Sequence, residues 1–110
     1  GEFSFNKVEL PDLSSNYDYE LPNTFSILPP YPNPFNPETT IQFTIDTGHD
    51  EISLNMFDIS GRWVETLAVG FMKPGKHKIR WYAGDHPSGI YFAVLQSGVR
   101  IQTTKLILIK

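Results

Sequence analysis

Apolar and polar residues alternate along most of the chain after residue 24, the period expected of a β-strand with one buried face. The clearest case runs from Ile41 to Ile45, where apolar side chains at 41, 43 and 45 are separated by polar ones. In all, the pattern predicts seven strands at residues 25–28, 41–45, 52–56, 63–67, 77–81, 90–95 and 99–109. No window of about 11 residues has a clean helical stripe. We therefore expect an all-β fold, an immunoglobulin-like seven-stranded antiparallel β-sandwich.

Segments rich in glycine and proline separate these strands. The most pronounced is residues 31–37, with three prolines in seven positions. Proline fixes φ and has no amide hydrogen, so this segment cannot be helical or lie in the middle of a sheet. We predict that it forms an edge or a crossover between sheets. A second turn is predicted at residues 58–61, where Gly61 takes a positive φ.

The charge distribution divides the chain near residue 22. Residues 1–30 hold five acidic residues and one basic residue, whereas residues 31–110 hold seven acidic and eight basic ones. We predict an acidic linker or a cloning-derived segment at residues 1–22 and the folded domain at residues 23–110. An extra strand on the sandwich is the alternative for residues 1–22. The net charge of −3 gives no electrostatic indication of a nucleic-acid partner.

Several function classes are excluded or disfavoured by composition. The chain has no cysteine, which excludes disulfides, cysteine zinc sites and thiol catalysis. No apolar run approaches the roughly 20 residues of a transmembrane helix, so no transmembrane segment is expected. The N-terminus carries no secretory signal, and a signal in an exported protein would lie upstream of this sequence.

Motifs for catalysis or metal binding are also missing. The three histidines, His49, His77 and His86, lack the short spacing of a metal-binding pair. No serine lies in a G-x-S-x-G elbow, and no glycine-rich phosphate loop is present. The acidic residues near predicted turns do not have the spacing of an EF-hand loop, and we interpret them as turn caps: Asp46, Asp50, Glu51 and Asp58. We expect no catalytic residue, no metal and no cofactor.

The exposed aromatic residues leave one alternative open. Trp81 is on the apolar phase of its strand and is predicted to lie in the core. Trp63 and Tyr82 are on the polar phase of theirs. Aromatic rings on a sheet face can bind sugars by stacking, so a carbohydrate-binding module is one alternative function. A structural spacer or assembly module is the other.

Five segments stand out in order along the chain: residues 31–41, 57–67, 73–81, 88–92 and 104–110. The first begins Tyr-Pro-Asn-Pro-Phe-Asn-Pro, and the second has the pattern aromatic-Asp-x-x-Gly-Arg-x-Val. Together these segments resemble blocks of the type A C-terminal sorting domain of the type IX (Por) secretion system. A similar pattern occurs in the immunoglobulin-like domain of the flagellar hook-capping protein. This chain departs from the family at Tyr82, where members often have Asp in a Trp-Asp-Gly motif.

The resemblance implies a non-catalytic secretion signal that directs an upstream cargo domain through the periplasm to the cell surface or medium. Its implied partners are the outer-membrane secretion machinery and a sortase-like surface protease. The residues that it assigns to recognition are Lys105, Leu106, Ile107, Leu108, Ile109 and Lys110. Those that it assigns to the shape of the domain are Asn33, Pro34, Phe35, Asn36, Pro37, Gly61, Arg62, Gly75, Trp81 and Gly89.

The last segment also invites an interpretation from its residues alone. Lys105 and Lys110 flank four apolar residues, and flanking charges commonly protect such aggregation-prone strands. A strand of this kind can pair with the sheet edge of a partner. It can equally be an ordinary strand of this sandwich, and the two interpretations are compatible.

Overall fold

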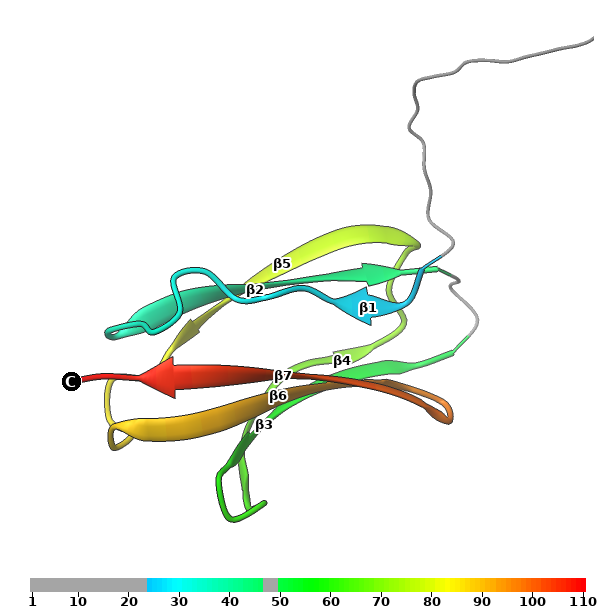
Figure 1. Ribbon diagram of the computed structural model, residues 1–110. Helices are drawn as coiled ribbons and strands as arrows, with labels where there is room; N and C mark the ends of the chain where they lie inside the picture. Colours follow the sequence, from blue (N-terminus) through cyan, green and yellow to red (C-terminus); the bar gives the residue numbers. More distant parts are fainter. Residues whose placement is uncertain (1–23, 47–49) are drawn as a thin grey trace, which may run out of the picture.

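The computed structural model describes residues 24–46 and 50–110, which form a two-layer β-sandwich without helices (Figure 1). The strands are β1 (Ser26–Ile27), β2 (Glu38–Ile45), β3 (Ile52–Asp58), β4 (Trp63–Gly70), β5 (Gly75–Tyr82), β6 (Gly89–Ser97) and β7 (Arg100–Leu108). One sheet has the order β1-β2-β5 and the other β4-β3-β6-β7. All neighbouring strands pair antiparallel. The predicted all-β fold with seven strands is confirmed, while the predicted linker at residues 1–22 and His49 lie outside the described residues.

The core lies between the two sheets, where alternate side chains from each layer meet. Complete burial of a large apolar side chain contributes about 1.5–3 kcal/mol, so the buried apolar residues of the core supply most of the stabilisation of the folded state. The buried apolar residues are Phe35, Ile41, Phe43, Ile45, Ile52, Leu54, Met56, Trp81, Ala83, Tyr91, Ala93, Leu95, Leu106 and Leu108. The prediction that Trp81 belongs to the core is confirmed. Within the described ranges, no helix has the length and apolar character needed to span a membrane.

Two strands differ from the side-chain pattern for backbone reasons. β2 begins at Glu38, three residues before the predicted start, because its pairing with β5 extends to Glu38 opposite Tyr82. β4 lies at the edge of the four-stranded sheet and shifts register twice against β3. Such irregularities insert unpaired residues, and this explains why burial does not alternate cleanly along β4.

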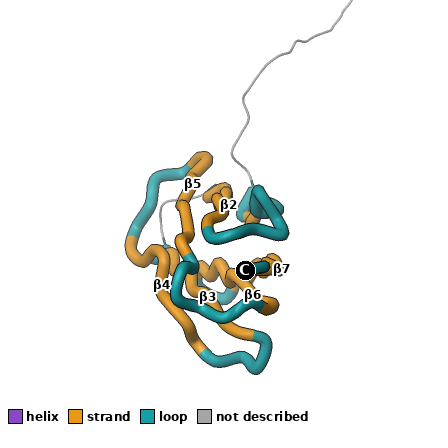
Figure 2. The backbone as a smooth tube through the Cα atoms, turned by 90° about the vertical axis from the view of Figure 1, so that its left-hand side faces the viewer, coloured by secondary structure: helices purple, strands orange, loops and turns teal. Residues whose placement is uncertain are grey.

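The connections between strands lie at two opposite ends of the sandwich (Figure 1). We call one of them the motif end; it comprises the proline corner (residues 31–37), residues 58–62, residues 83–88 and the end of β7 with residues 109–110. Among the described residues, the opposite end comprises residues 46, 50–51, 70–75 and 97–100. Figure 2 views the molecule from the motif end, with the end of the chain in the foreground. Four of the five sequence blocks therefore contribute to one end of the fold, although they are far apart in sequence.

Candidate functional site

The side chain of Asn33 joins the proline corner to the last strand. Asn33 Nδ2 donates a hydrogen bond to the carbonyl oxygen of Lys105 (3.0 Å), and the amide of Ile107 donates one to Asn33 Oδ1 (2.9 Å). The carboxamide thus provides one donor and one acceptor, the same groups that a backbone peptide provides in a neighbouring strand. Asn33 acts as a side-chain substitute for a strand residue beside β7.

The backbone of Phe35 continues this pairing. The Phe35 amide donates to the carbonyl of Ile107 (2.9 Å), and the Ile109 amide donates to the carbonyl of Phe35 (3.0 Å). Before this point the corner pairs with the other sheet, through a bridge between Tyr31 and Thr40. The corner therefore crosses from one sheet to the other, which confirms the predicted edge or crossover.

These contacts close part of an exposed sheet edge. β7 is the edge strand of its sheet, and such a strand offers unpaired amides and carbonyls to other chains. Between Lys105 and Ile109, the backbone groups of β7 that face the sheet edge are already bonded. The Lys105 carbonyl and the Ile107 amide bond to the side chain of Asn33, and the Ile107 carbonyl and the Ile109 amide bond to the backbone of Phe35. A partner strand could pair along this part of β7 only by displacing the proline corner.

The aromatic core holds the corner in place. Phe35 is only 3% exposed, and its ring centroid lies 5.6 Å from that of Trp81. Trp81 in turn makes an edge contact with Tyr91 at 5.4 Å and donates its indole N–H to Glu65 Oε1 (3.0 Å). Buried Thr39 adds a hydrogen bond to the carbonyl of Pro32 (2.7 Å). The corner is thus anchored on both sides of Asn33.

The six residues predicted for recognition divide into two groups. Leu106 and Leu108 are buried in the core, and Ile107 is half-buried on the outer face of the sheet. Lys105, Ile109 and Lys110 are exposed. The Lys110 amide donates to Ser88 Oγ (3.0 Å), so the last residue is held against the loop between β5 and β6. Only the exposed residues can contact a partner while the domain stays folded.

A shallow hollow of about 360 Å³ lies where the corner and the last strand meet. Its lining residues come from both segments: Pro32, Pro34, Phe35, Asn36 and Ile109. The exposed lysines Lys105 and Lys110 belong to the same strand end. The motif end therefore combines a rigid apolar hollow with neighbouring positive charge.

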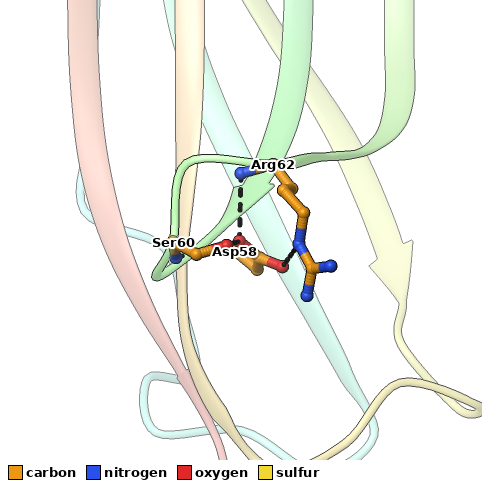
Figure 3. Close-up of polar contacts among 3 residues, drawn as sticks. All are labelled: Asp58, Ser60 and Arg62. Atoms are coloured by element: carbon orange, nitrogen blue, oxygen red, sulfur yellow. Dashed lines mark hydrogen bonds and ion pairs between the residues drawn. The ribbon is translucent and has the colours of Figure 1, made fainter.

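The turn between β3 and β4 completes the motif end and depends on Asp58 (Figure 3). Asp58 Oδ1 accepts hydrogen bonds from the Ser60 hydroxyl (2.6 Å) and from the amides of Ser60 (2.9 Å) and Arg62 (3.0 Å). Because these donors, above all the Ser60 hydroxyl, favour the carboxylate, the pKa of Asp58 falls from 3.8 to about 2. Gly61 has a φ of +87°, which confirms the predicted positive φ.

A comparison with protein families assigns the chain to a family. A family model described as the secretion system C-terminal sorting domain matches residues 30–110. The chain belongs to this family. A comparison with curated proteins found no match. Type IX sorting domains mark proteins that are exported to the cell surface or the medium, and the family is not a catalytic one.

The remaining shape residues of the sorting domain are not all at one place. Gly61, Arg62 and Gly89 lie at the motif end, and the Arg62 side chain is 82% exposed with its Nε 3.3 Å from Asp58 Oδ2. Gly75 begins β5 at the opposite end. Of the predicted shape residues, Gly75 is therefore the one that lies at the opposite end.

The described histidines and the acidic residues Asp46 and Asp58 of this sorting domain have structural contacts. His77 stacks on Phe43 and its Nε2 lies 2.7 Å from the carbonyl of Lys73. Asp58 caps its turn as predicted, whereas Asp46 pairs with distant Arg100 at 2.6 Å. Across the described ranges, no group of three or more histidine, cysteine or acidic residues is placed to hold a metal ion.

Sequence reasoning missed two residues that build the site. Ser88 and Thr39 lie inside two of the sequence blocks, but the sequence pattern predicts no contact for either of them. The Thr39 hydroxyl donates to the carbonyl of Pro32, seven residues earlier in the chain. The Ser88 hydroxyl accepts from the amide of Lys110, 22 residues later. A serine directly before Gly89 was the available signal, but its partner, the Lys110 amide, could not be predicted from spacing.

Proposed function

We propose that this sorting domain directs an upstream cargo domain across the outer membrane, and that the secretion machinery recognises its folded motif end. The main support for this proposal is the pairing of Asn33 and Phe35 with β7 from Lys105 to Ile109. This pairing makes the recognition element discontinuous, since it joins the first and the last sequence blocks in one surface.

The motif end is held by contacts within the domain, which favours recognition of this folded surface rather than of a flexible tail. Phe35 is buried against Trp81, and Lys110 is bonded to Ser88, so the exposed groups between them are ordered before any partner binds. A preordered surface avoids the entropy cost of immobilising side chains and backbone on binding. Exposed Lys105 and Lys110 favour an acidic surface on the partner.

The domain itself has no catalytic role in this proposal. Any enzymatic activity belongs to the cargo, and a sortase-like surface protease removes the sorting domain after transport. This step follows from the resemblance to the family and is the finer part of the proposal.

The test is a transport assay with the full 110-residue chain fused behind a reporter that carries a periplasmic signal, in a bacterium with type IX secretion. Deleting residues 105–110 is a poor test, because it also removes Leu106 and Leu108 from the core. A charge reversal avoids this problem. The variant is Lys105→Glu with Lys110→Glu, and its matched control is Lys76→Glu with Lys78→Glu on exposed positions of β5.

We expect the wild-type and control fusions to reach the surface or medium, and the motif-end variant to accumulate in the periplasm. Thermal unfolding of each purified variant confirms that all are folded. Export of the motif-end variant at the wild-type level would contradict recognition through these lysines. Periplasmic retention of the folded wild-type fusion would contradict the sorting function in that host and favour a spacer.

A further inference from the structure

The outer face of the four-stranded sheet has an unusual set of side chains for a surface exposed to water. Strand register places them in three rows across β4, β3, β6 and β7. The rows are Trp63–Phe57–Phe92–Lys105, Thr66–Asn55–Val94–Thr103 and Val69–Ser53–Gln96–Ile101. Lys105 is the single charged residue among these twelve. The face therefore combines six apolar side chains with five uncharged hydrogen-bonding ones.

Trp63 is fixed in place on this face although most of it is exposed. Its indole N–H lies 3.1 Å from Thr66 Oγ1 and 3.3 Å from Asn55 Oδ1, while the residue remains 61% exposed. An aromatic ring held in this way binds a partner with little further loss of conformational freedom. In the aromatic-Asp-x-x-Gly-Arg-x-Val pattern of the second sequence block, Trp63 occupies a position that the pattern does not specify.

Hydrogen-bonding groups lie directly beside the indole. Asn55 Oδ1 accepts from both Trp63 and Thr66, whereas Asn55 Nδ2 has no hydrogen bond to any described residue. The amide can therefore donate to a ligand without breaking an existing contact. Thr103 lies in the same row two strands away.

A hollow of about 420 Å³ lies at the other end of this face. Its polar lining consists of Asp50, Glu51, Ser53 and Gln96. Rows two residues apart along a strand are separated by about 6.6 Å, so the row of Ser53 and Gln96 lies about 13 Å from the row of Trp63. An aromatic platform and a polar hollow thus follow one another along β3.

We propose that this face binds a neutral oligosaccharide made of pyranose units, extended along β3 from the hollow to Trp63. A pyranose ring has an apolar C–H face that can stack on an indole, and a rim of hydroxyl groups that pair with amides, hydroxyls and carboxylates. A neutral sugar also brings no charge of its own that would be buried beside the apolar side chains of this face. The proposed sugar site shares Lys105 with the motif end, but it rests on Trp63, Asn55 and the hollow and does not depend on the sorting function.

The experiment is a titration of the full 110-residue chain with three probes: cellohexaose, xylohexaose and mannohexaose. Isothermal calorimetry measures binding independently of tryptophan, and fluorescence reports on the environment of exposed Trp63, since Trp81 is buried. The variants are Trp63→Ala and Asn55→Ala. The matched control is Tyr82→Ala, which removes an aromatic residue of similar exposure (67%) on the strand β5 of the other sheet.

We expect at least one probe to bind saturably with a dissociation constant below about 1 mM. Trp63→Ala should weaken binding by about tenfold or more and Asn55→Ala by a smaller factor, with no change for Tyr82→Ala. Absence of saturable binding to all three probes at about 10 mM would overturn the proposal. Binding that survives Trp63→Ala would do the same. So would a chain that binds no sugar and forms a dimer that Trp63→Ala abolishes, because the face would then be an interface between two copies.

Discussion

The two ends of this sandwich are built from similar short connections but are held together differently. At the motif end, side chains bond to backbone groups of distant segments: Asn33 to β7, Thr39 to Pro32, and Ser88 to Lys110. At the opposite end, the side chains of Arg100 and Asp46 form an ion pair (2.6 Å) between distant segments. These long-range contacts at the motif end are therefore directional bonds to the backbone, whereas the long-range contact between Arg100 and Asp46 is a bond between two charged side chains.

This difference shows where the chain requires an exact shape. Side-chain bonds to the backbone fix both position and orientation, whereas an ion pair on a partly exposed surface tolerates movement and is screened by salt. Four sequence blocks meet at the motif end, whereas Arg100 and Asp46 lie outside all five blocks. Substitutions at matched positions can test how far this contrast extends.

The largest expected effect is on Phe35, which joins the corner to the aromatic core. Phe35→Ala should lower the free energy of unfolding by about 3–5 kcal/mol, because it leaves a cavity beside Trp81. Phe71→Ala at the opposite end is the control, since Phe71 is 70% exposed and should change stability by less than about 0.5 kcal/mol. Urea denaturation followed by circular dichroism measures both. Equal losses of unfolding free energy in Phe35→Ala and Phe71→Ala would contradict the difference between the two ends.

A smaller loss of unfolding free energy is expected when the Asn33 side chain, which bonds to β7 in place of a neighbouring strand, is removed. Asn33→Ala breaks the bonds to the Lys105 carbonyl and the Ile107 amide, which should cost about 1–2 kcal/mol. Amide hydrogen exchange should become faster at Ile107, and Gln96→Ala at the opposite end should leave that amide unchanged. Unchanged protection of Ile107 in Asn33→Ala would show that the corner does not close the β7 edge.

The ion pair at the opposite end should contribute less and depend on salt. Arg100→Ala should cost about 1 kcal/mol or less, because the Arg100 side chain is 38% exposed and its contact with Asp46 is partly solvated. The cost should fall as sodium chloride rises from about 0.05 to 1 M, since salt screens exposed charges. The cost of Asn33→Ala should not fall in the same series. A salt-independent cost for Arg100→Ala would argue that its packing over Phe25 dominates.

The smallest effect at neutral pH is expected for Asp58, whose contribution depends on ionisation. Folding lowers the pKa of Asp58 from 3.8 to about 2, so the folded state favours the carboxylate. Its stabilisation is present above pH 4 and is lost as the pH falls through about 2. The difference in unfolding free energy between wild type and Asp58→Asn should therefore shrink over this window in acid titrations. A difference that stays constant from pH 5 to pH 2 would contradict the lowered pKa.

Most of the fold could be predicted from local patterns, but most of the site could not. Alternation in residues 41–45 identified β2, and the phase of Trp81 placed it in the core. The resemblance assigned Lys105 to Lys110 to recognition as one segment, yet Leu106 and Leu108 lie inside the sandwich. Local patterns report which face a residue takes in its own strand. They do not report which layer covers that face.

The sequence by itself determined the all-β class, the positions of the strands, the positive φ at Gly61 and the family of the domain. These properties depend on residues that are close together, through side-chain period, turn chemistry and motif spacing. Only the tertiary structure decided that Asn33 substitutes for a strand beside Ile107, 74 residues away. Such a contact depends on how the two sheets are stacked, and packing between layers is a property of the whole chain rather than of any segment.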